Sequence, residues 1–159
     1  QGWLSNARRV KLLRSNFLKY WHQAKDKPKV LVKMGAGHLV RGRSMTDVYD
    51  LGALLPEVAA MNGGHTFNLL VLPGKSSSVA MFDPSAMRYQ NGAAQGGKGL
   101  NLLMDNVPAD QFTLIDLRPL RPLVSQNRQG ISPELVQTIY GFDAVVIMSG
   151  STAANNIIP

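Results

Sequence analysis

His38 is the residue in this sequence whose type and surroundings best fit chemistry, because it stands among basic side chains at the end of an apolar run. An imidazole gains and loses a proton near neutral pH, as general acid–base catalysis requires. Lys33, Arg41 and Arg43 flank it, and cations there could stabilise an anionic substrate or intermediate. Gly37 would let a ligand approach the backbone closely. We therefore predict His38 as a catalytic residue, with Lys33, Gly37, Arg41 and Arg43 binding the substrate.

The same histidine admits two other interpretations. Together with its basic neighbours it could bind an anion, or its ring nitrogen could ligate a haem iron. It could also tie a loop together through hydrogen bonds alone. Asp50, Asp83 and Asp116 lie near the ends of expected elements, where they could either orient a histidine or cap a helix, and capping is the more frequent use.

Other kinds of site are weakly supported. Gly35-Ala36-Gly37 follows an apolar run, as in a dinucleotide fingerprint, but Val40 occupies the third glycine position. The glycine-rich stretch 92–99 has the spacing of a phosphate loop, yet Gly99 stands where a magnesium-binding Ser or Thr is needed. The chain has no cysteine, and its three histidines lie on different expected elements. We predict no metal site and no cofactor.

The element that must position His38 is the apolar run over 29–34, which Pro28 and Gly35 bound. A short run of aliphatic and β-branched residues between such breakers is typical of a buried strand. In open α/β sheets, ligands gather at the carboxyl ends of strands. The pattern therefore predicts a strand that delivers His38 to a site.

Helices and strands alternate along the rest of the chain. Apolar residues at helical spacing predict helices over 3–25 and 51–61, and Ser132-Pro133-Glu134 is a good helix start. Apolar runs predict further strands over 67–72, 112–117 and 142–148. Residues 74–110 are expected to form an irregular insert or lid. This alternation predicts an α/β fold, with a mostly parallel β-sheet covered by helices on both faces.

Length and charge limit the number of domains and the kinds of partner that the chain can have. The 159 residues suit a single domain over 1–159, and no apolar run is long enough to span a membrane. Residues 1–43 hold eleven Lys and Arg against one acid, whereas the remainder holds six against nine. We interpret the basic part as a solvated face rather than a nucleic-acid surface. A docking role for residues 1–25 is a further alternative.

Several segments resemble the erythromycin-esterase-like and ChaN-like superfamily. They are the helix with Asn16-Phe17, the run Lys29–Met34 followed by Gly35-Ala36-Gly37-His38, the segment Asp50–Leu55, and the closing Phe142–Ile147. In the esterases, an apolar strand runs into a loop that ends in histidine, and a Gly-Leu-Leu-type helix follows. His38 matches that active-site histidine, and Gly37 stands where the esterases often have Asn.

The resemblance implies a hydrolase that acts on a small-molecule substrate. The family also carries an earlier strand that ends in a Gly-Glu-x-His motif, which is absent from these residues. We therefore expect the chain to be the C-terminal part of a larger protein, with its site completed by a missing N-terminal segment or a homo-oligomer partner. The alternative is a non-catalytic binding module for an anionic ligand such as haem or phosphate.

Overall fold

The computed structural model describes residues 2–44, 46–83, 85–94, 99–127 and 129–154, with the backbone alone for 2–5. The chain forms two compact units, Gln1–Asn68 and Leu69–Pro159, called unit 1 and unit 2 below. Each is described by itself. The expected single domain over 1–159 stays a prediction.

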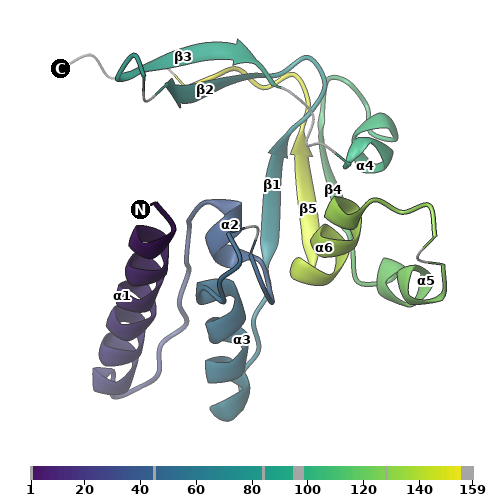
Figure 1. The fold of residues 1–159 in the computed structure, drawn as a ribbon. Helices are drawn as coiled ribbons and strands as arrows, with labels where there is room; N and C mark the ends of the chain where they lie inside the picture. Colours follow the sequence, from purple (N-terminus) through teal and green to yellow (C-terminus); the bar gives the residue numbers. More distant parts are fainter. Residues whose placement is uncertain (1, 45, 84, 95–98, 128, 155–159) are drawn as a thin grey trace. The chain divides into compact units, whose positions relative to one another are not determined.

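Unit 1 is built from three helices: α1 (Gly2–Gln23), the short α2 (Ala36–Leu39) and α3 (Leu51–Met61). Helices α1 and α3 run side by side, joined by an extended segment and α2 (Figure 1). The core of the unit lies on α3, and α1 covers it with its apolar stripe, as expected of an amphipathic helix. The α3 core residues are Leu51, Leu54 and Val58, and the α1 residues packed on them are Leu13, Phe17, Leu18 and Trp21.

The expected strand over 29–34 is not a strand in the structure. The segment is extended, but the described residues offer it no neighbouring strand. Val32 and Met34 instead pack against the α3 core, while Leu31 is 95% exposed. Helices therefore bury one side of the apolar run. This burial explains why the composition of the run resembles that of a buried strand.

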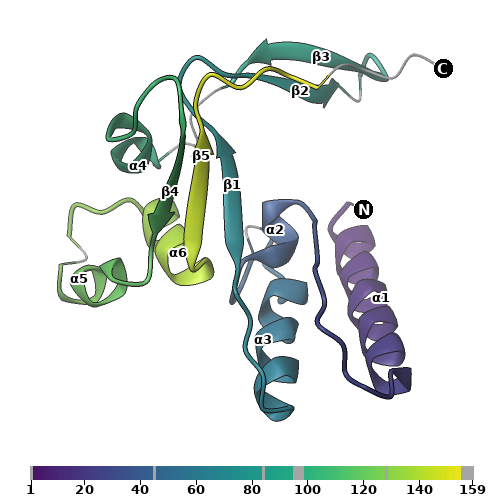
Figure 2. The same cartoon turned by 180° about the vertical axis from the view of Figure 1, so that it is seen from behind.

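Unit 2 contains a mixed three-stranded sheet in the order β1-β5-β4. Strand β1 (Leu69–Pro73) pairs in parallel with the central β5 (Ala144–Met148), whereas β4 (Phe112–Asp116) pairs with β5 antiparallel. Seen from behind, the three strands lie next to one another with α6 (Pro133–Gly141) along one face (Figure 2). The helix start at Ser132 is confirmed, because its side chain accepts a hydrogen bond from the Leu135 N–H at 3.1 Å.

The predicted mostly parallel sheet with helices on both faces is wrong. The described residues contain a small mixed sheet, a separate two-stranded antiparallel sheet and six helices. Val71 and Leu114 lie on one face of the mixed sheet and are 50% and 67% exposed, so helices do not cover that face. Apolar composition is typical of parallel, fully buried strands, but it does not specify which strands pair or in which direction.

The stretch 74–110 is more regular than expected. Strands β2 (Ser78–Asp83) and β3 (Arg88–Ala93) form an antiparallel hairpin, and α4 (Asn101–Asp105) follows it. Strand β2 has only a four-residue apolar run, 79–82, and β3 is polar and mostly exposed, so neither strand stands out in the sequence. Residues 95–98 of the glycine-rich stretch lie outside the described residues. The remaining helix of unit 2 is α5 (Leu120–Gln126).

Candidate active site

The first half of the candidate site is His38, which α2 carries. This helix is a single turn, begun by the His38 N–H donating to the Gly35 carbonyl at 2.9 Å. Its far end is held by the Asn68 side-chain amide, which donates to the Leu39 carbonyl at 2.8 Å. A turn this short has little stability of its own. Its position therefore depends on these bonds and on α3.

Helices α2 and α3 meet at Gly52, which is buried in the first turn of α3. A side chain at this position would collide with the backbone of Leu39 and Val40. Glycine therefore permits α2 to lie directly on α3. This close approach fixes the distance between His38 and the start of α3.

The second half of the site is Asp50, the residue that caps α3. The chain reverses direction between α2 and α3, where Arg43 and Tyr49 form an antiparallel bridge. Gly42 (φ +82°) and Asp47 (φ +62°) supply the left-handed conformations that this tight reversal needs. One Asp50 oxygen then accepts a hydrogen bond from the Leu51 N–H at 2.7 Å. The reversal thus returns the carboxylate to the side of α2.

The two halves meet in a hydrogen-bonded pair. His38 Nδ1 lies 2.5 Å from Asp50 Oδ2, while Oδ1 is held by the α3 backbone. The Asp50 side chain is 3% exposed and that of His38 is 23% exposed. The carboxylate is therefore buried and fixed on both oxygens, whereas part of the imidazole reaches the surface. This arrangement orients one ring nitrogen and leaves the other for chemistry.

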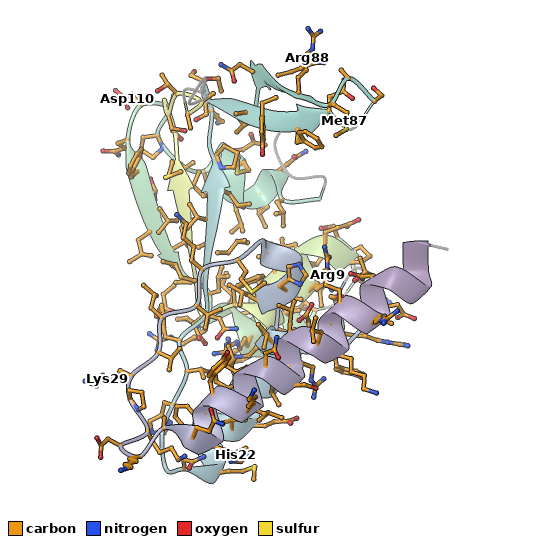
Figure 3. The ribbon with its side chains drawn as sticks, turned by 90° about the vertical axis from the view of Figure 1, so that its left-hand side faces the viewer. Arg9, His22, Lys29, Met87, Arg88 and Asp110 are labelled. Carbon is orange, nitrogen blue, oxygen red and sulfur yellow. The ribbon has the colours of Figure 1, made fainter. Side chains whose placement is uncertain are left out.

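Arg9 lies against that other nitrogen. It projects from α1 on the side of α2 (Figure 3), and its Nη2 is 3.5 Å from His38 Nε2. A guanidinium can only donate hydrogen bonds, so in a neutral imidazole Nε2 is the acceptor and Nδ1 carries the proton given to Asp50. This tautomer has its lone pair on Nε2 and is the one that can act as a general base.

None of the described contacts joins the His38 side chain to the residues predicted to bind substrate. Gly37 is exposed in α2 directly before His38, and Lys33 is exposed on the extended segment. Arg41 donates to the Thr66 carbonyl at 3.3 Å, and Arg43 pairs with Asp47 at 2.8 Å. Among the described contacts, the cation beside His38 is Arg9.

Sequence reasoning named Asp50 as either a histidine partner or a helix cap, and the structure gives it both contacts. It missed Arg9, which it counted only among the Lys and Arg of the basic part, residues 1–43. Arg9 and His38 are 29 residues apart. Neither periodicity nor a local motif connects residues so distant in sequence, so only the packing of α1 near α2 brings them together.

Comparisons with protein-family models, curated proteins and solved structures found no match for this chain. Within the described ranges, no cluster of three or more His, Cys, Asp or Glu could hold a metal ion. Among the helices that the structure describes, none is both long enough and apolar enough to cross a bilayer.

Proposed function

We propose that unit 1 carries the acid–base centre of an esterase-like hydrolase, with His38 as the base and Asp50 as the residue that orients it. The observation that carries this proposal is the 2.5 Å contact between His38 Nδ1 and the buried Asp50 carboxylate. A histidine held this way, with its second nitrogen near the surface, is the arrangement that activates water or an alcohol in hydrolases.

The geometry implies a sequence of proton transfers. Nε2 takes a proton from a water molecule as the water oxygen bonds to the carbonyl carbon of an ester. The imidazolium that forms is stabilised by Asp50, whose carboxylate already faces Nδ1. Nε2 then returns the proton to the leaving alcohol oxygen as the carbon–oxygen bond breaks. Arg9 is close enough to Nε2 to stabilise negative charge on the reacting oxygen.

The resemblance to the erythromycin-esterase-like and ChaN-like superfamily supports the same role, because His38 matches that family's active-site histidine. On this proposal, the substrate is a small molecule with an ester bond. The Glu and His of the family's Gly-Glu-x-His motif would come from another segment of the same protein or from a second copy. The chain alone would then show at most a small fraction of the complete site's activity.

The alternative of a haem-binding module is less well supported by the geometry. A histidine that donates Nδ1–H to a carboxylate can ligate iron through Nε2. However, the Arg9 guanidinium lies 3.5 Å from this nitrogen, where its charge repels a cationic metal centre. The same guanidinium favours an anionic or polarised oxygen. The contact therefore supports acid–base chemistry rather than iron ligation.

The test uses an activated ester, p-nitrophenyl acetate, because its hydrolysis needs little beyond a positioned base. The 159-residue chain should hydrolyse it faster than buffer, and His38→Ala should remove that excess. Asp50→Asn should lower the excess about 10²-fold, within the range that acid–base groups supply. Its amide can donate to Nδ1 and so place the proton on Nε2, which is the wrong tautomer for a base.

His22→Ala is the matched control, because His22 is an exposed histidine on α1 with no described partner (Figure 3). It should keep the excess rate and report the background that any surface imidazole gives. An excess rate that survives His38→Ala would overturn the proposal. Asn is as good a helix cap as Asp, so urea unfolding of Asp50→Asn should show a preserved fold.

A further inference from the structure

We propose that the His38 site takes an ester whose acyl or alcohol part bears a carboxylate or phosphate, held by Arg9. This inference rests on the proposed function, since it names the substrate class of that site. The inference goes beyond that function by assigning substrate binding to α1 rather than to Lys33, Arg41 and Arg43.

The Arg9 guanidinium carries this inference. It is exposed, and the described contacts use one nitrogen only: Nη2 donates to Asn6 Oδ1 at 3.0 Å and faces His38 Nε2. Three of its five N–H donors have no partner among the described residues. No carboxylate is described in contact with it. An arginine placed against a reactive nitrogen, with donors to spare, is suited to an anionic oxygen of the substrate.

The substrate's ester carbon must reach His38 Nε2, and Arg9 beside that nitrogen then meets an anionic group close to the scissile bond. An uncharged ester would not gain this interaction, so the site discriminates by charge.

Inorganic phosphate is the probe, because it presents the anion without the ester. Imidazole NMR signals of His38 are followed at constant pH as phosphate is added to the 159-residue chain. We expect a saturable shift at millimolar phosphate. Arg9→Gln should weaken binding about tenfold, the effect of losing one charge-assisted contact. Arg9→Lys should recover part of that loss, because it restores the charge without the planar fork.

Arg8→Gln is the matched control, because Arg8 is also exposed on α1 and no contact is described for it. Its affinity for phosphate should match that of the unmodified chain. Helix content by circular dichroism checks that both variants fold. A His38 signal that does not saturate, or a binding curve unchanged by Arg9→Gln, would overturn the inference.

The outcomes separate this inference from the proposed function. If phosphate binds through Arg9 but the ester rate survives His38→Ala, the hydrolase proposal fails and an anion-binding site remains. If the rate depends on His38 while phosphate leaves its signals unchanged, the acid–base centre stands and the assigned substrate class is wrong. The substrate class is then checked with two p-nitrophenyl esters, the acetate and the anionic hemisuccinate, whose KM values Arg9→Gln should bring together.

Discussion

At the scale of single residues, the site depends on one carboxylate that serves two neighbours. Asp50 caps α3 through Oδ1 and orients His38 through Oδ2. A cap must stand at the first turn of its helix, so the dyad can form only where α3 begins. The cap position was predictable from the sequence around 50–55. The histidine was predicted too, but the contact between them required the reversal over 43–49.

A second carboxylate gives a prediction about pH. Asp116 pairs with Arg118, and the guanidinium and backbone N–H of Arg118 hold the pKa of the Asp116 carboxyl below its ordinary value. A lowered folded-state pKa means that the unfolded chain binds the proton more tightly. This pair therefore stabilises the fold at pH values above the ordinary pKa of an Asp carboxyl. Its contribution is lost as the pH falls through the lowered folded-state pKa of Asp116.

Arg118→Gln should raise the Asp116 pKa towards its ordinary value, because the larger cause of the lowering is removed. Part of the lowering should remain, since the backbone N–H of residue 118 still donates. Carboxyl carbon NMR titration measures both effects. Asp83 is an internal control, because the side chain and backbone of Ser85 lower its pKa, without any contribution from Arg118. Parallel shifts of both carboxyls would contradict the assignment to the pair.

At the scale of elements, helices were easier to predict than strands because their signals are local. The apolar stripe of α1 and the Ser132-Pro133 start of α6 are each encoded within a few residues. The segment 29–34 has the composition of a strand, but a strand also needs a partner, which the described residues do not provide. Local composition therefore failed where pairing decides the structure.

The contact between α2 and α3 provides the next prediction. Gly52→Ala places a methyl group against the backbone of Leu39 and Val40, so α2 must move away from α3. Overpacking of this kind costs about 1–3 kcal/mol. It should also separate His38 from Asp50, so the site-dependent ester rate should fall together with the urea midpoint.

Gly35→Ala is the control, because a side chain at Gly35 would meet nothing within 4 Å and its φ of −59° suits any residue. Its stability and ester rate should stay close to those of the unmodified chain. A Gly52→Ala variant that is destabilised but fully active would show that the dyad tolerates movement of α2. That result would weaken the argument that this glycine positions the site.

At the scale of the whole molecule, the sequence predicted most elements but not their assembly. Strands β4 and β5 fall within predicted apolar runs and β1 overlaps a third, yet β4 runs antiparallel to β5, and one face of the sheet stays partly exposed. Strand direction and order are set by contacts between distant segments. Arg9 escaped prediction for the same reason, since its role appears only after α1 has packed near α2.

Charge is distributed unevenly over the whole molecule, because residues 1–43 hold eleven Lys and Arg and one acid. Repulsion among these cations destabilises the fold, and salt should screen it. We expect the urea midpoint to rise with added NaCl. The double variant Lys25→Gln, Lys29→Gln should have a higher urea midpoint without salt, and its stability should rise less when NaCl is added. The difference should be about a few tenths of a kcal/mol, the size of the interaction between such surface charges.

Both lysines are exposed and have no described partner, so the double variant removes repulsion without breaking a described contact. Arg88→Gln is the comparison, because Arg88 is exposed on β3, beyond the basic segment, where acids outnumber bases (Figure 3). Its salt response should equal that of the unmodified chain. Equal salt responses in all three proteins would show that the clustered cations do not repel one another appreciably. The basic segment would then be a solvated surface whose charge matters for binding anions and not for stability.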